Sequence, residues 1–360
     1  MRRRLIVHGS PTTKFEFTHQ VAITDATEPT YFCGGSMLDA THILTAAHCT
    51  YAVTGGYGNN GVVSNRRSAS DLTVHVYRWT APTDPGSGEF GSYDSGSGLS
   101  DDERCTQQIG VSAIAVHPDH TPPSVDMDVA VLTLSSAARC AGNEIALVEL
   151  YTGVASRGGE LQGPDYLSPL DGRTATMVGW GYTNAHPSVL PRPMPELLPP
   201  SLRKVDVRLQ NYRFCESLFA SHPTLEFTTN FLCSFDPSMG GAPCSGDSGG
   251  PLTLPMQPGD TRPVQVGIIS FSLNNATHSL CDWGFGAYSR VAAARWWILE
   301  QQHGTEARTQ IMIASIATAG WLLLLAVLSL LFVRREVKKN ALRRVQDRVD
   351  EILGEGHESK

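Results

Sequence analysis

Several features that mark common functional classes are missing from this 360-residue sequence. It has no C-x-x-C pair, so the cysteine spacing of zinc fingers and thioredoxin-type motifs is absent. Basic residues do not cluster before residue 334 and the formal net charge is −7, which argues against a nucleic-acid surface. No metal-ligand cluster stands out either. We therefore expect no nucleic-acid partner, no metal and no cofactor.

A signal peptide is also missing, since no apolar run of the required length follows Met1. The eight cysteines nevertheless favour an oxidising compartment, because they are even in number and widely spread. Eight reduced thiols buried in a core are the alternative. We expect that an upstream signal and pro-segment precede this chain, and that residues 1–5 are the remnant of the pro-segment.

Helical periodicity is poor before residues 291–301, whereas short β-rich runs broken by Gly, Pro and Asp are frequent. Several short strands with turn signals predict an all-β barrel or sandwich. The β-rich runs lie at residues 15–23, 31–38, 43–49, 73–77, 111–117, 129–134, 175–180, 205–209 and 264–271.

One long uncharged run occupies residues 311–333. At about 1.5 Å per residue, its 23 residues span roughly 34 Å, which is enough to cross a bilayer core. A buried core helix is the alternative. Residues 334–360 open with a basic segment, so the positive-inside bias predicts a cytosolic tail and an extracellular or lumenal position for residues 1–310. The predicted protein is thus single-pass, with the lipid bilayer as a partner and residues 304–310 as a short stalk.

The stretch Cys244–Pro251 reads Cys-Ser-Gly-Asp-Ser-Gly-Gly-Pro. Glycines on both sides of Ser248 permit a tight turn that exposes backbone N–H groups to a substrate carbonyl. A Gly-rich surface turn is the alternative. A serine hydroxyl needs a base to activate it and a third group to orient that base. The candidates for these groups are His48, after an apolar run, and Asp128, before a buried-looking strand, with Asp126 as a second candidate for the acid. Taken alone, a structural histidine and an aspartate that caps a turn are the alternatives.

These residues stand in motifs whose combination resembles the trypsin/chymotrypsin-type serine endopeptidases. The resemblance covers residues 6–303 and implies two antiparallel six-stranded β-barrels with a C-terminal helix. The motifs that carry it are Phe32-Cys33-Gly34-Gly35-Ser36, Thr45-Ala46-Ala47-His48-Cys49, Asp128-Val129-Ala130-Val131-Leu132, Gly179-Trp180-Gly181, Gly246-Asp247-Ser248-Gly249-Gly250-Pro251 and Ile269-Ser270-Phe271.

The resemblance implies that Ser248 is the nucleophile, that His48 is the general base and then acid, and that Asp128 orients His48. It makes the backbone N–H groups of Gly246 and Ser248 the oxyanion hole. Protein or peptide substrates are implied, and protein inhibitors are possible partners.

The resemblance also implies disulfides and a specificity pocket. It pairs Cys33 with Cys49, Cys215 with Cys233, and Cys244 with Cys281; this leaves Cys105 and Cys140, which we expect to pair. The pocket base is Ala242 and the walls are Ser272 and Gly286. Because Ala242 offers no charge to a substrate Lys or Arg, we expect an open pocket that prefers apolar or aromatic residues.

Activation in this family frees an N-terminal ammonium that pairs with the Asp before the catalytic Ser, so the implied pair is Ile6 and Asp247. Leu5, rather than a basic residue, precedes Ile6. Asn275 begins a glycosylation sequon, Asn275-Ala276-Thr277. Two other classes stay open: a catalytically silent protease-fold binding protein, and a membrane adhesion or scaffold module.

Overall fold

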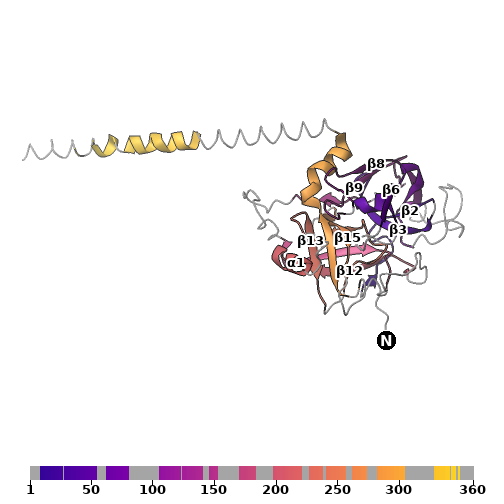
Figure 1. Cartoon of the computed structure of the whole chain (residues 1–360). Coiled ribbons are helices and arrows are strands. Elements are labelled where there is room, and N and C mark those ends of the chain that lie inside the picture. Colours follow the sequence, from indigo (N-terminus) through magenta and orange to yellow (C-terminus); the bar gives the residue numbers. More distant parts are fainter. Residues whose placement is uncertain are drawn as a thin grey trace, which may run out of the picture. The chain divides into compact units, whose positions relative to one another are not determined.

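The computed structural model gives the chain as two units, residues 1–302 and residues 303–360. Figure 1 traces the first as two neighbouring groups of strands, one from the first half of the sequence and one from the second. The residues that it describes are 9–26, 28–54, 62–80, 105–122, 124–140, 146–152, 170–183, 198–220, 227–237, 241–256, 262–273, 281, 283–304, 328–340, 342–345 and 348.

The first group of strands closes into a six-stranded barrel. Its order is β2 (Gln20–Asp25), β3 (Glu28–Met37), β4 (His42–Thr45), β9 (Ala130–Leu134), β8 (Gln107–Val116) and β7 (Leu72–Val76). The β-branched and aliphatic side chains of these strands fill the barrel, and Val21, Ile43, Leu44, Val74 and Leu132 are fully buried. Short elements flank the barrel: η1 (Ala47–Thr50), η2 (Ala69–Asp71) and the hairpin of β5 (Tyr51–Thr54) and β6 (Val62–Arg66).

The second group is a sheet of eight strands in the described residues, and six of these strands follow one another along the path of the expected barrel. The two additional strands, β1 (Ser10–Pro11) and β10 (Glu149–Leu150), are two residues long and pair with β12 and β15. The other six run in the order β12 (Arg203–Arg208), β11 (Thr174–Gly179), β14 (Pro251–Thr253), β15 (Val264–Phe271), β16 (Phe285–Arg290) and β13 (Phe231–Phe235). A bridge between Leu209 and Ser234 brings the two ends of this path together, which gives the second barrel.

Two helices accompany the barrels. The expected C-terminal helix is confirmed at residues 291–304, where Val291, Ala294 and Ile298 pack into the core of the first barrel. The helix α1 (Tyr212–Phe219) was not predicted. It begins at Asn211, whose side-chain oxygen accepts a hydrogen bond from the backbone N–H of Phe214, and it buries only Cys215 and Phe219.

The structure joins the eight cysteines into the four expected disulfides, Cys33–Cys49, Cys105–Cys140, Cys215–Cys233 and Cys244–Cys281. Contacts between the barrels are polar as well as apolar. The buried Ser36 hydroxyl donates to the side-chain oxygen of Gln265 across the interface at 2.6 Å. The backbone N–H of Gly34 donates to the carbonyl of Ser248 at 2.7 Å. The predicted nucleophile turn is therefore tied to the first barrel.

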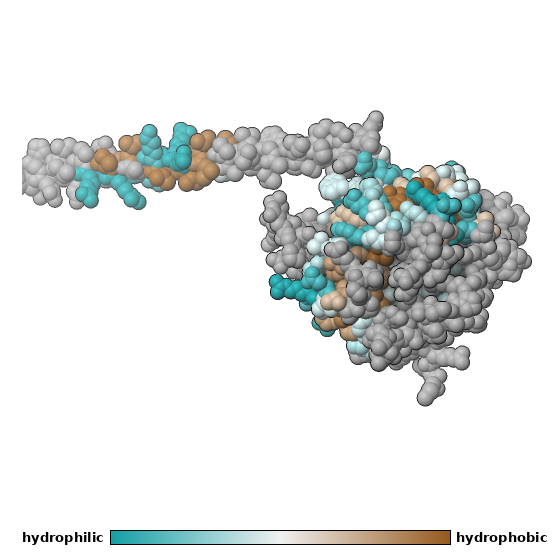
Figure 2. All heavy atoms as spheres, viewed as in Figure 1, coloured by the Kyte–Doolittle hydropathy of each residue, from teal (hydrophilic) through white to brown (hydrophobic). Residues whose placement is uncertain are grey.

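The unit from residue 303 contains the predicted membrane span, 311–333, of which residues 311–327 lie outside the described part. Residues 328–340 and 342–345 are helical. Figure 2 shows hydrophobic and hydrophilic atoms along this helix. No helix within the described ranges is both long and apolar enough to span a bilayer.

Candidate active site

Paired strand ends bring His48 and Asp128 together. Strands β4 and β9 are antiparallel neighbours, and Thr45 lies opposite Ala130 at the end of the pairing. His48 follows Thr45 within η1, and Asp128 lies two residues before Ala130. The η1 turn is held by the Thr50 hydroxyl, which donates to the Ala47 carbonyl at 2.7 Å, and by the disulfide from Cys49 to Cys33 of β3.

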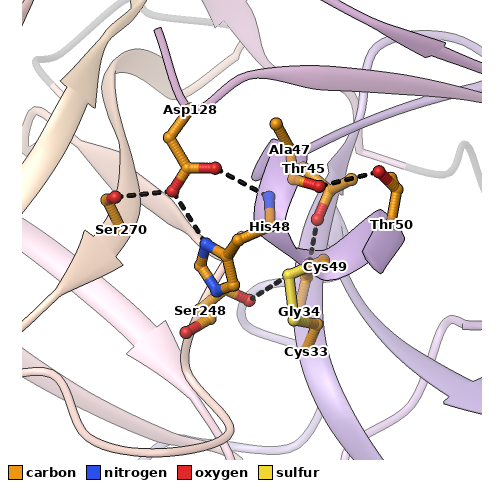
Figure 3. Close-up of a disulfide and its surroundings, with 10 residues drawn as sticks. All are labelled: Cys33, Gly34, Thr45, Ala47, His48, Cys49, Thr50, Asp128, Ser248 and Ser270. Atoms are coloured by element: carbon orange, nitrogen blue, oxygen red, sulfur yellow. Dashed lines mark hydrogen bonds and ion pairs between the residues drawn. A yellow bond between two sulfur atoms is a disulfide. The ribbon is translucent and has the colours of Figure 1, made fainter. Parts of the chain in front are cut away.

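The Asp128 carboxylate receives three hydrogen bonds (Figure 3). The His48 backbone N–H donates to Oδ1 at 2.8 Å, and His48 Nδ1 lies 2.7 Å from Oδ2. The Ser270 hydroxyl of β15 donates to the same Oδ2 at 2.6 Å. Since a carboxylate only accepts, Nδ1 of His48 carries a proton. This leaves Nε2 on the side of the ring that points toward Ser248 in Figure 3.

Asp128 is completely buried, yet it is ionised at neutral pH. Burial alone would raise its pKa; the charges of His48 and His120 and the hydrogen bonds from His48 and Ser270 oppose burial and lower the pKa to about 2. Asp126, the other candidate, faces elsewhere. Its carboxylate accepts from the Thr228 hydroxyl at 2.7 Å and from the Asn230 amide at 3.0 Å.

Ser248 is held on a turn that only glycines can form. Gly246 has φ +101° and Gly249 has φ +81°, which are left-handed values that disfavour other residues. A Cβ on Gly249 would lie 2.2 Å from the Thr45 hydroxyl and 2.4 Å from the Gly34 carbonyl. The turn therefore packs directly on β3 and β4 of the first barrel, next to η1 and His48.

Asp247, the residue before Ser248, is a buried carboxylate. It accepts hydrogen bonds from the backbone N–H groups of Gly181 at 2.7 Å and Cys244 at 3.0 Å. Burial raises its pKa to about 6, although both amides act in the opposite direction. The predicted cationic partner, the N-terminal amine of Ile6, lies outside the described residues.

The predicted pocket residues lie close to one another beside this turn. Ala242 is fully buried. The Ser272 hydroxyl donates to the Pro243 carbonyl at 2.7 Å and lies 2.9 Å from the Phe285 carbonyl, so it links both walls. A Cβ on Gly286 would lie 2.5 Å from the Tyr288 hydroxyl, which leaves no room for a larger residue there.

Three further residues or clusters bear on the sequence predictions: the glycosylation candidate, a possible metal cluster, and Ser270. Asn275 lies outside the described residues. Cys33, His48 and Cys49 bring potential metal ligands within 4.8 Å, but both sulfurs are in a disulfide and provide no thiolate. Ser270 was not assigned a role from sequence, although it stands in one of the motifs, because its bond to Asp128 joins residues 142 positions apart.

Comparison of the sequence and the structure with known proteins identifies the family to which this chain belongs. The family model described as "Trypsin" matches residues 6–87 and 91–298. The chain belongs to the trypsin family. A trypsin alpha-4 of Lucilia cuprina is 25% identical over 294 residues, covering 82% of this chain and 86% of the relative. Mouse neuropsin, a serine protease, shares the fold with a TM-score of 0.55 at 18% identity, covering 82% of this chain and 98% of neuropsin.

Not every relative in the trypsin family is named as a protease. Glucanase inhibitor protein 3 of Phytophthora infestans is 25% identical to this trypsin-family chain over 298 residues and covers 82% of it and 88% of the inhibitor. Family membership supports a peptidase, but the side chains of the site must decide between activity and binding.

Proposed function

We propose that the chain is a serine endopeptidase that uses Ser248, His48 and Asp128. The observation that carries this proposal is the hydrogen-bonded series from Ser270 through Asp128 to His48, whose ring faces Ser248. A protein that only binds a partner has no need of a buried carboxylate that fixes one proton on an imidazole. The silent binding protein remains the alternative.

In the proposed reaction, Ser248 Oγ attacks the carbonyl carbon of a peptide bond and passes its proton to His48 Nε2. Asp128 stabilises the imidazolium that forms. The backbone N–H groups of Gly246 and Ser248 donate to the oxyanion. The C–N bond then breaks, His48 protonates the leaving amine, and an acyl-enzyme remains. Water, deprotonated by His48, attacks the ester, and Ser248 leaves with its proton restored.

A fluorophosphonate probe tests the proposed nucleophile. We expect the processed wild-type protein to be labelled at Ser248 and the Ser248→Ala variant to remain unlabelled. Ser245→Ala is the matched control, because Ser245 lies on the same turn and has no assigned role; it should be labelled normally. Processed wild-type protein that fails to label would favour the silent binding protein.

For substrates, we propose a preference for apolar or aromatic side chains before the scissile bond. The fully buried Ala242 supports this preference, because a substrate cation there would be desolvated without a partner.

Peptides that differ only at this position test the preference. We expect kcat/KM for Leu and Phe to exceed that for Arg at least about 100-fold, from the cost of an unpaired buried charge. Ala242→Asp should reverse the order by supplying the missing anion. Fast cleavage after Arg by the wild type would refute the proposal.

For localisation, we propose that residues 311–333 anchor the protein in a membrane, with 334–360 in the cytosol. Leu328, Leu330, Leu331, Phe332 and Val333 are 52–65% exposed on their helix, and a basic segment follows directly. Alkaline carbonate should leave the full chain in the membrane pellet and release a chain that ends at residue 310. A tag after Lys360 should be accessible only in permeabilised cells. Release of the full chain would contradict the anchor.

A further inference from the structure

Asp126 lies two residues before Asp128 on the segment that joins β8 to β9, yet its side chain bonds the second barrel. Its Oδ1 accepts a hydrogen bond from the Thr228 hydroxyl at 2.7 Å. The side-chain amide of Asn230 donates to Oδ1 at 3.0 Å and lies 3.1 Å from Oδ2. Thr228 and Asn230 stand just before β13, 102 and 104 positions later in the chain. The carboxylate therefore links the segment that carries Asp128 to the barrel that carries Ser248.

The segment that receives Asp126 is itself held in place. The Asn230 backbone N–H donates to the Thr228 hydroxyl oxygen at 3.2 Å. Arg290, the last residue of β16, donates from its backbone N–H to the Asn230 carbonyl at 2.8 Å and from its guanidinium to the Thr229 carbonyl at 3.0 Å. Thr228 and Asn230 are thus fixed to the second barrel by contacts that do not involve Asp126.

The backbone of Asp126 is fixed as well as its side chain. Its N–H donates to the Ser124 hydroxyl oxygen at 3.1 Å, and its carbonyl accepts from His120 Nδ1 at 2.9 Å. The preceding residue, Val125, is buried and belongs to the same apolar cluster as Phe227 of the second barrel. The segment before Asp128 is therefore held against the second barrel by an apolar side chain and by a carboxylate.

Met127 lies between Asp126 and Asp128, and its backbone is strained. Its φ is +45°, a left-handed value that residues other than Gly, Asn and Asp rarely adopt. The Met127 carbonyl accepts from the Val129 backbone N–H at 2.7 Å, so Asp128 is the central residue of a three-residue turn. A conformation of this kind persists only where its surroundings fix it. The contacts of Asp126 and the turn around Asp128 fix it here on either side.

We propose that Asp126 is a positioning residue for the reaction of Ser248. Its carboxylate, bound to the second barrel, holds Met127 in the left-handed conformation. That conformation directs the Asp128 carboxylate toward His48. Without the link, the strained residue relaxes and the Asp128 carboxylate turns away from the imidazole that it orients. This proposal rests on the proposed function, because it names what aligns the acid of that same site.

Variants of the full, processed chain test the link from both sides. Asp126→Ala removes both carboxylate oxygens, whereas Asp126→Asn keeps one acceptor oxygen and the shape of the side chain. Thr228→Val removes the donor hydroxyl at nearly constant volume. Asp119→Ala is the matched control, since it removes an exposed carboxylate from the same segment. Titration with a fluorophosphonate gives the concentration of active sites in each preparation, so misfolded protein does not affect kcat.

For a short peptide with Leu before the scissile bond, we expect Asp126→Ala to lower kcat about tenfold to a hundredfold, because small displacements of a catalytic group are costly. KM should stay within about twofold, since Asp126 orients the acid rather than the substrate. Asp126→Asn should recover kcat to within about threefold of wild type. Thr228→Val should lower kcat about threefold and should add nothing to Asp126→Ala, because both remove the same link. Asp119→Ala should leave kcat unchanged. A kcat for Asp126→Ala within about twofold of wild type overturns the proposal.

Met127 supplies a test that a merely structural role of Asp126 would not satisfy. Asparagine adopts the left-handed conformation more readily than methionine, so Met127→Asn should reduce the need for the link. We expect Asp126→Ala to cost less than about threefold in kcat in the Met127→Asn chain, against about tenfold or more in the wild type. Equal losses in the two chains would mean that Asp126 does not act through Met127 and would overturn the proposal.

A measurement without turnover separates this proposal from the function on which it rests. In the Ser248→Ala chain, the Nδ1 proton of His48 should give a far-downfield NMR resonance, because of its 2.7 Å hydrogen bond to Asp128. Asp126→Ala should move this resonance upfield or abolish it, and Asp119→Ala should leave it in place. That result would stand even if the wild type cleaved no peptide, which would contradict the proposed function alone. A resonance that Asp126→Ala leaves unchanged would overturn the positioning role alone.

Discussion

At the scale of single residues, one carboxylate oxygen of Asp128 accepts two hydrogen bonds. Oδ2 accepts from His48 Nδ1 at 2.7 Å and from the Ser270 hydroxyl at 2.6 Å. Ser270 comes from the second barrel, so it is the only contact of that carboxylate, among those in the described residues, that crosses between the barrels. Ser270 thus adds to the contacts that keep Asp128 ionised and holds its carboxylate toward His48 once the barrels have docked.

Ser270→Ala should therefore lower kcat about tenfold to a hundredfold, because a hydrogen bond to a charged group is worth about 1.5–3 kcal/mol. KM should change little, since Ser270 holds the acid rather than the substrate. Ser270→Thr keeps the hydroxyl and should restore most of kcat. Ser289→Ala, which removes a buried hydroxyl with no hydrogen-bond partner in the described residues, is the control. A kcat for Ser270→Ala within twofold of wild type would contradict this role.

The residues predicted from sequence share one property, which is that each stands in a short local motif. Asp128 was preferred over Asp126 from its place directly before a strand, and the Asp126 carboxylate does turn away to Thr228 and Asn230. Ser270 contacts Asp128 through a tertiary hydrogen bond that spans 142 positions. No local pattern encodes this contact.

At the scale of elements, the turn around Ser248 is limited by its packing. Gly249 has φ +81°, and a Cβ there would enter the space of Thr45 and Gly34. Gly304 has a similar φ of +77° but nothing within 4 Å of the same position. A side chain at Gly304 would therefore cause backbone strain alone, whereas a side chain at Gly249 would cause the same strain and also a steric clash with the first barrel.

Gly249→Ala should cost about 3 kcal/mol or more of unfolding free energy, whereas Gly304→Ala should cost about 1 kcal/mol from the left-handed backbone alone. Urea titration followed by tryptophan fluorescence measures both. Equal costs for the two variants would mean that the turn can move away from β3 and β4, and that the nucleophile is less rigidly placed than the contacts imply.

The elements that were predicted best from the sequence are the strands formed by a continuous run of apolar residues. The apolar runs at 129–134 and 175–180 correspond to β9 and β11. Helix α1 was missed because its eight residues are too few for a sequence pattern to distinguish a helix from a strand or a loop. Strands β1 and β10 are two residues long, which is too short to show the alternation of apolar and polar residues that predicts a strand. They are defined only by their pairing with β12 and β15.

At the scale of the whole molecule, the buried Asp247 makes the unfolding free energy depend on pH. Its pKa is raised from 3.8 to about 6 by burial. Between these values the folded chain holds a proton that the unfolded chain releases, so the unfolding free energy falls as pH rises through this window. An ammonium group that pairs with Asp247 would remove this loss.

A chain that begins at Ile6 should therefore gain stability over the chain that begins at Met1 as pH rises from 4 to 7, by up to about 3 kcal/mol. Differential scanning fluorimetry of both chains across this range gives the difference in Tm. Asp247→Asn in both chains should abolish the pH dependence of the difference. A Tm difference that stays constant with pH would mean that Ile6 does not reach Asp247.

The division of the site between two barrels also fixes when the site can exist during synthesis. A ribosome delivers His48 and Asp128 first, Ser248 much later, and Ser270, which bonds Asp128 across 142 positions, later still. Because domains fold from the N-terminal side as the chain emerges, the first barrel can begin to form before the proposed nucleophile has been made. Chain order alone therefore delays the proposed reaction until the last strands have paired, whether or not an inhibitor is present.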